Sequence, residues 1–155
     1  MTTPQVQPLD VIEIEMAVLA RSLELLRRHG RIHRDLDRSG YLLLRTLEDG
    51  GPLSIHSLAE RVGLDGSTVT RQVAALVEDG LAERSPDPAD RRACRVSPTQ
   101  RGRDLMREVQ GRRRERMEEA LASWSDGDRA ELARVLARLN RSIAQHVLET
   151  AAASD

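Results

Sequence analysis

The chain has 155 residues, with 24 basic side chains, 25 acidic side chains and a formal net charge of −1, which suits one domain or a domain with appended helices. Its apolar runs are far shorter than the roughly 20 residues that a membrane-spanning helix requires. The N-terminal stretch before Met16 lacks the basic and apolar regions of a secretory signal, so we expect a cytoplasmic protein with no membrane partner.

A long first helix is predicted over about residues 9–34, because apolar side chains recur there every three or four positions. These side chains are Ile12, Met16, Leu19, Leu23 and Leu26. The next helix has Asp37 or Ser39 as its N-cap and the stretch Gly50-Gly51-Pro52 as its stop. Its apolar positions are Leu43, Leu44 and Leu47.

Two shorter helices follow, and their spacing is that of a helix-turn-helix. The first is expected over 55–62 with Ser54 as its N-cap, and the second over 66–79 with Asp65 as its N-cap. Gly63 relieves the turn between them, because that turn needs a backbone conformation that is costly for other residues. The internal face consists of Leu58, Ala59, Val62, Val69, Val73 and Leu76. Helix pairs in proteins that do not bind DNA can have the same spacing.

The second helix of this pair is expected to present short polar side chains at its start, where a recognition helix meets base edges in the major groove. These side chains are Ser67, Thr68, Thr70, Arg71 and Gln72. Serine and threonine can donate or accept hydrogen bonds, arginine can bind guanine through two bonds, and glutamine can bind adenine in the same way. The alternative is that the hydroxyl groups only cap the helix and the other side chains face solvent.

Two short strands are predicted over 81–84 and 93–96, joined by a loop rich in proline and aspartate. A hairpin beside a helix-turn-helix brings its tip near the adjacent minor groove, whose narrow and negative floor suits Arg91 and Arg92. Asp90 could pair with one of these arginines and fix its direction. The alternative is that the aspartates only form turns and the arginines point to water.

A fifth helix is expected from its cap Thr99 to about Ser123, and the pair Ser125 and Asp128 predicts the capping box of a sixth. The sixth helix has an apolar stripe of Leu132, Leu136, Leu139, Ile143 and Val147. Because the middle of the chain can form its own core, the stripes on the terminal helices favour burial against another subunit. Packing within one chain is the alternative. The expected dimer interface contains Ile12, Met16, Leu19, Leu136, Leu139, Ile143 and Val147.

Residues 36–102 resemble the winged helix-turn-helix of the multiple antibiotic resistance regulator (MarR) family, and the long flanking helices fit as well. The segments that carry the resemblance are Gly51-Pro52-Leu53, Leu58-Ala59-Glu60-Arg61-Val62-Gly63-Leu64, Ser67-Thr68-Val69-Thr70-Arg71, Leu76-Val77-Glu78-Asp79-Gly80-Leu81 and Asp87-Pro88-Ala89-Asp90-Arg91-Arg92. One departure is Pro98, where the family usually has leucine. Since proline cannot donate a hydrogen bond to a neighbouring strand, the second wing strand is expected to end early.

The resemblance implies a mainly α fold with a small β wing. A winged helix-turn-helix DNA-binding domain is expected over 36–98, and the flanking N- and C-terminal dimerisation helices over 9–35 and 99–150. The implied molecule is a homodimer whose two recognition helices meet the half-sites of a pseudo-palindromic operator in double-stranded DNA.

The resemblance also implies roles for single residues. The positions that touch the major groove in the family are Ser67, Thr68, Thr70, Arg71 and Gln72 in this sequence. Arg92, with Arg91 beside it, stands where the family's wing arginine enters the minor groove. Asp90 stands where the family's aspartate holds that arginine.

Many members of the family bind small aromatic or phenolic acids between the dimer helices and the DNA-binding lobe, and such ligands shift the population of DNA-competent states. Tyr41 with Arg45 one turn on could hold a carboxylate ligand; alternatively Tyr41 fills the core and Arg45 lies on the surface. Cys94, the only cysteine, is expected to pack as a small apolar residue. His29 and His33 have a spacing that suits a metal, but no clear third ligand accompanies them.

The sequence contains no glycine-rich phosphate loop, no recognisable nucleophile and base motif and no metal-ligand cluster, so we expect no enzyme, no cofactor and no metal site. Residues 84–116 hold eleven arginines against five acids, a local excess that attracts phosphate. The sequence therefore predicts a DNA-binding transcriptional regulator, a repressor relieved by a small-molecule effector. The alternative is a winged-helix protein-interaction module that does not bind DNA.

Overall fold

The computed structural model describes residues 7–29, 36–90 and 92–152. Its contacts divide the chain into two compact units, Met1–Asp35 and Leu36–Asp155. In the first unit the described element is one helix, α1 (Pro8–His29), whose apolar side chains are exposed, Ile12, Met16 and Leu19 among them. The last expected residues of this helix, 30–34, lie outside the described residues.

The second unit begins with α2 (Arg38–Gly50), and the sequence explains both of its ends. Of the two expected caps Asp37 is the one used, because its Oδ1 accepts the Gly40 N–H at 2.7 Å. The helix stops before Gly51, whose φ of 72° is rarely adopted by other residues. The buried face carries the predicted leucines Leu43, Leu44 and Leu47.

The predicted helix pair forms from α3 (Ile55–Val62) and α4 (Gly66–Glu78). Ser54 and Asp65 are their N-caps, as expected. Gly63 ends α3 in the left-handed conformation, with φ 68° and ψ 37°, which is the conformation that favours glycine after a helix. The caps and this glycine therefore fix where each helix begins and ends.

Three short antiparallel strands form one sheet in the order β1–β3–β2. They are β1 (Leu53–Ser54), β2 (Ala82–Pro86) and β3 (Cys94–Pro98). β1 was not predicted, because two residues are too few to show the alternation that marks a strand. The β2–β3 hairpin is the expected wing, and each of its strands begins one residue later and ends two residues later than predicted.

The expectation that β3 ends early at Pro98 is wrong. Pro98 is buried, ends the strand and pairs with Ala82. β1 pairs only with Val96 and Arg95, so the N–H that Pro98 lacks is not needed for a bond to that strand. The Pro98 carbonyl accepts a hydrogen bond from the Arg103 guanidinium at 2.8 Å.

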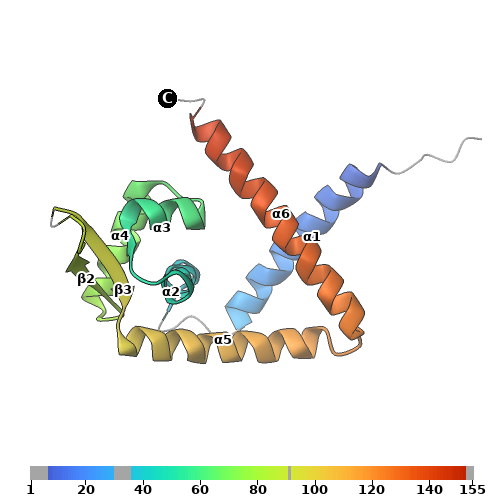
Figure 1. The fold of residues 1–155 in the computed structure, drawn as a ribbon. Helices are drawn as coiled ribbons and strands as arrows, with labels where there is room; N and C mark the ends of the chain where they lie inside the picture. The colour runs from blue at the N-terminus through green and yellow to red at the C-terminus, as the bar shows by residue number, and fades with distance from the viewer. Residues whose placement is uncertain (1–6, 30–35, 91, 153–155) are drawn as a thin grey trace, which may run out of the picture. The chain divides into compact units, whose positions relative to one another are not determined.

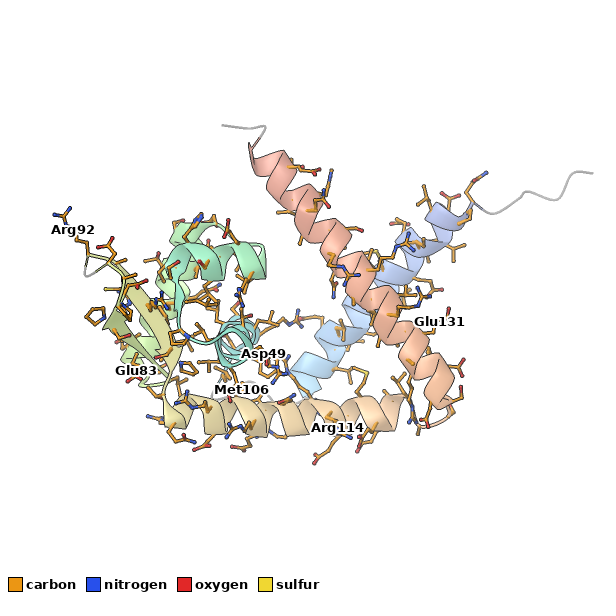
Figure 2. The ribbon with its side chains drawn as sticks, in the orientation of Figure 1. Asp49, Glu83, Arg92, Met106, Arg114 and Glu131 are labelled. Carbon is orange, nitrogen blue, oxygen red and sulfur yellow. The ribbon has the colours of Figure 1, made fainter. Side chains whose placement is uncertain are left out.

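The long helix α5 (Gln100–Ala120) starts directly after β3, with Thr99 as the predicted cap. Its first turn passes so close to the segment between α4 and β2 that a Cβ on Gly102 would lie 2.0 Å from the Leu81 carbonyl oxygen. Met106 and Val109 on the following turns are buried, where α5 contacts α2 (Figure 2). The first half of α5 is therefore part of the core.

The last helix, α6 (Asp126–Ala152), begins at the predicted capping box. The Asp128 N–H donates to the Ser125 hydroxyl, and the Asp128 carboxylate accepts the Ser125 N–H, both at 3.2 Å. Hydrogen bonds from Ser125 lower the pKa of Asp128 below its ordinary value. Figure 1 shows α5 running from the wing at one end to the turn into α6 at the other.

The core of the second unit is aliphatic, in keeping with a sequence that contains no phenylalanine, one tyrosine and one tryptophan. Its fully buried side chains are Leu43, Leu44, Leu47, Leu58, Val69, Val73, Val96, Met106 and Val109. α2 lies at the centre, in contact with α3, α4, α5 and β3 (Figure 1). The prediction of a mainly α fold with a small β wing is confirmed. The separation of a dimerisation region from a DNA-binding domain stays a prediction, since α5, α6 and the wing belong to one unit.

Among the described residues, none of the helices combines the length and the apolar character needed to cross a membrane.

Candidate nucleic-acid interface

The helix-turn-helix is held together by apolar side chains between its two helices. Leu58, Val69 and Val73 are fully buried, whereas Val62, expected on the same face, is half-buried. After the turn at Gly63, the Leu64 N–H donates to the carbonyl of Ala59 at 3.1 Å. Because one side of α4 is anchored in the core, its opposite side is fixed toward solvent.

Asp65 organises the first turn of α4, which is the end of a recognition helix that meets bases. Its Oδ1 accepts the Thr68 N–H at 2.8 Å and the Ser67 hydroxyl at 2.5 Å. These bonds, that from Ser67 foremost, hold the pKa of Asp65 far below its ordinary value. The Ser67 hydrogen is thus engaged within the turn, and its oxygen lone pairs remain to accept hydrogen bonds.

The five predicted contact residues of α4 do not form one exposed row. Ser67, Thr70 and Arg71 are exposed and share one face of the helix, whereas Thr68 and Gln72 are half-buried beside the core face. The Thr70 hydroxyl donates to the Gly66 carbonyl at 2.7 Å. The Oε1 atom of Gln72 is buried without a hydrogen-bond partner among the described residues.

Replacing Asp65 by alanine is expected to loosen the first turn of α4 and to lower the melting temperature. Since the pKa of Asp65 is lower in the folded state, its charged form stabilises the fold above the unfolded pKa of about 3.9, and this contribution is lost as the pH falls toward the folded pKa. The melting temperatures of wild type and Asp65→Ala should differ most near neutral pH, and the difference should shrink below about pH 4.

The matched control for this change is Asp65→Asn, which keeps an oxygen acceptor at the N-cap and removes the charge. It should lower the melting temperature less than Asp65→Ala at neutral pH. A difference between wild type and Asp65→Ala that stays constant through acid would contradict the assigned role of the carboxylate.

The loop between β2 and β3 is closed by its own backbone. The Asp87 N–H donates to the Ala93 carbonyl at 2.8 Å, and the Ala93 N–H donates to the Asp90 carbonyl at 2.9 Å. The Asp90 carboxylate accepts the backbone N–H of Arg92 at 2.9 Å, so Asp90 shapes the turn rather than holding the Arg92 side chain. Figure 2 shows Arg92 at the wing tip, pointing away from the sheet. Arg91 lies outside the described residues.

The wing contains an ion pair that we did not predict. Asp87 Oδ2 accepts a hydrogen bond from Arg95 Nε at 2.7 Å, and its Oδ1 accepts the Ala89 N–H at 2.8 Å. These bonds, that from Arg95 foremost, lower the pKa of Asp87 below its ordinary value. The pair is a diagonal contact across the hairpin, because the register places Arg95 opposite Ser85, two residues before Asp87.

The expected effector residues Tyr41 and Arg45 both lie on α2, and each of them contacts another side chain. Arg45 pairs with Asp49 at 3.3 Å, whereas the guanidinium carbon of Arg113 on α5 lies 4.2 Å from the centre of the Tyr41 ring. Partial burial lowers the pKa of Arg113 below its ordinary value. We missed Arg113 because it is far from Tyr41 in the sequence and only the packing of α5 on α2 joins them.

The apolar stripe expected to form the dimer interface is exposed in α6. Leu136, Ile143 and Val147 are exposed, and Leu139 is half-buried. A cavity of about 400 Å³ opens between α5 and α6. Its apolar wall includes Met117, Leu121, Leu132 and Leu136. Contiguous apolar surface of this kind marks places where another chain can pack.

The expectation that Cys94 is a packed apolar residue is wrong, because its side chain is exposed. Cys94 lies on the same face of β3 as the buried Val96, but it stands where the hairpin has already left the core. His33 lies outside the described residues, so the pair with His29 is untested. Among the described residues no three histidines, cysteines or acids gather in a way that could hold a metal ion.

A helix pair anchored by its own core, an exposed polar face on the second helix and a two-stranded wing beside it define a winged helix-turn-helix protein. The family model described as "MarR family" matches residues 36–94. The uncharacterized HTH-type transcriptional regulator YxaD of Bacillus subtilis is 36% identical over 135 residues, which cover 87% of this chain and 94% of YxaD. The chain therefore belongs to the MarR family of helix-turn-helix transcriptional regulators, which are not enzymes.

Solved structures show the same fold. A probable transcriptional regulator from Pseudomonas aeruginosa is 30% identical, with a TM-score of 0.67 over 81% of this chain and 93% of that one. The PcaV transcriptional regulator from Streptomyces coelicolor, solved in complex with its natural ligand, is 23% identical, with a TM-score of 0.66 over 92% of this chain and 99% of that one. At that identity the likeness to PcaV concerns the fold alone.

Proposed function

We propose that this regulator is a homodimer that binds a pseudo-palindromic DNA site and represses transcription from it. The observation that carries the proposal is the exposure, on one unit, of the polar face of α4 around Arg71 and of Arg92 at the wing tip. A recognition helix reads base edges in the major groove, and a wing arginine suits the narrow minor groove beside it. Acidic or bulky apolar groups on α4, which an interaction module would favour, are not found at these positions.

A gel-shift titration of the protein on its own promoter region tests the proposal. We expect a shift at micromolar protein that weakens steeply as salt is raised, because phosphate contacts release counterions from the DNA. The protein should also lower transcription from that promoter in a purified system. No shift on any fragment of the region, at any salt concentration, would instead support the alternative of a protein-interaction module.

The dimer is supported by the exposed apolar side chains of α1 and α6 and by the apolar cavity between α5 and α6. Two recognition helices about 34 Å apart would then meet successive turns of the duplex. Analytical ultracentrifugation should give twice the 17.3 kDa mass of one chain. A single chain in solution at micromolar concentration would contradict the dimer.

Arg92→Ala is expected to weaken DNA binding by a similar factor on all sequences. The reason is that a guanidinium held against the minor groove acts mainly through charge. The slope of log affinity against log salt should fall by about two units, because each dimer loses two charges, one from each wing. Titrations on the promoter fragment and on an unrelated duplex measure both quantities, and a loss confined to the promoter fragment would contradict this role.

An effector that releases the protein from DNA is proposed near Tyr41, where α2 meets α5. The ring carries the Arg113 guanidinium on its face, and an aromatic face beside a cation suits an aromatic carboxylate. The structure of PcaV, a protein of this fold, was solved in complex with its natural ligand. The effector would favour the DNA-incompetent state only to the extent that it binds that state more tightly than the DNA-competent state.

4-Hydroxybenzoate is a suitable probe for this site, with cyclohexanecarboxylate as the non-aromatic control. We expect the first to lower DNA affinity at concentrations where the second does not. The variant Tyr41→Leu should require more 4-hydroxybenzoate for the same release. Equal effects of the two acids, or an unchanged midpoint in the variant, would contradict this site.

A further inference from the structure

In the described part of the wing, the acid that bonds to an arginine side chain is Asp87, whereas the Asp90 carboxylate accepts the backbone N–H of Arg92. Asp87 stands directly after β2, and its side chain is only 15% exposed. One carboxylate oxygen holds Arg95 Nε on β3 at 2.7 Å, and the other holds the Ala89 N–H of the loop at 2.8 Å. One side chain thus connects the loop to the central strand of the sheet.

We propose that Asp87 is a positioning residue for DNA binding: by bonding to Arg95 and to the loop backbone, it holds the wing tip so that Arg92 faces the minor groove. The inference rests on the proposed DNA-binding function. None of the described residues of this loop, 87–90, 92 and 93, is buried, so the shape of this part depends on these polar bonds and on the two backbone bonds that close it.

Electrostatics alone gives the opposite expectation, which makes the proposal testable. Asp87 contributes a negative charge near DNA and neutralises Arg95. If its charge were all that mattered, removing it would strengthen binding and steepen the salt dependence, because one repulsive charge disappears and one arginine is released. A positioning role predicts weaker binding despite this gain of net positive charge.

The experiment measures DNA affinity for wild type, Asp87→Ala, Arg92→Ala and the double variant in the full chain. We expect Asp87→Ala to lose at least half, on a logarithmic scale, of what Arg92→Ala loses. In the Arg92→Ala background the Asp87 change should have little further effect, since the residue that it positions is absent. Asp87→Asn, which keeps one of the two acceptor oxygens, should recover part of the loss.

Glu83→Gln is the matched control, because it removes an acid from β2 without touching the loop (Figure 2). It should leave DNA affinity unchanged or raise it. Melting temperatures test whether Asp87→Ala is folded. We expect that it is, because the change lies in a loop outside the apolar core. If wild type binds DNA and Asp87→Ala binds as well or better, or if the losses of the two single variants simply add, the positioning role is overturned and the DNA-binding function stands. If wild type shifts no fragment, both are overturned.

Discussion

Gly102→Ala is expected to lower the free energy of unfolding of the second unit by about 3 kcal/mol or more, because the added methyl group meets backbone atoms. The added Cβ would lie 2.0 Å from the Leu81 carbonyl oxygen and 2.9 Å from its carbon. Both are backbone atoms, so no side chain can rotate to make room. α5 or the segment leading into β2 must shift, and the hydrogen bond from Thr99 N–H to the same carbonyl, 3.0 Å long, must weaken.

Chemical or thermal unfolding at matched protein concentration measures the loss. For a chain of this size, about 3 kcal/mol corresponds to a melting temperature lower by roughly 6–12 °C. Gly111→Ala provides the control, because Gly111 lies on the same helix with nothing within 4 Å of its added Cβ. Alanine should stabilise the helix there, by up to about 1 kcal/mol. A similar loss at both glycines would show that the contact with Leu81 is not the cause.

Arg71→Ala is expected to weaken binding by about 1–3 kcal/mol for each half-site of the operator, or roughly 5- to 150-fold per half-site, if Arg71 reads a base edge. Arg71 is exposed on the same face of α4 as Ser67 and Thr70, where its fork of donors matches the acceptors of guanine. Because a base contact carries sequence information, the variant should lose preference at one base pair in each half-site and bind non-specific DNA almost as well as wild type.

Affinities for the operator and for a set of single-base variants measure this preference. Arg134→Ala is the control, since Arg134 is an exposed arginine on α6 that pairs with Glu131. It lies outside the proposed DNA-binding surface. It should change neither affinity nor preference. If Arg71→Ala instead lowers affinity equally for all sequences and reduces the salt slope, Arg71 contacts phosphate and the reading of bases lies elsewhere on α4.

The helices were predictable from the sequence because their signals are local. Asp65, Thr99 and the Ser125–Asp128 pair mark helix starts through bonds to residues two or three positions away, and the apolar stripes have the helical period. The strands were harder to bound. β1 has two residues, and the extent of β3 depends on what pairs with each edge rather than on Pro98 itself.

Side-chain partners at the site could not be predicted in the same way. The Asp87–Arg95 and Tyr41–Arg113 contacts join residues that the fold, not the sequence, brings together. Gln72 was expected to face outward with Ser67, but the helix phase places it beside the buried Val73. The exposure of Cys94 follows from how far the hairpin projects, which depends on the length of its partner strand.

The absence of a side chain at Gly102 has a mechanical consequence. The start of α5 packs directly against the backbone that joins α4 to the wing, and Met106 and Val109 hold its next turns in the core. The helix α5 and the reading head, by which we mean the helix-turn-helix with its wing, therefore form one stiff piece. A helix of 21 residues is about 31 Å long. Rotating this stiff piece by about 10° about the far end of α5 would therefore displace the reading head by roughly 5 Å. Small changes of angle between two α5 helices in a dimer would thus be converted directly into the separation of the two heads.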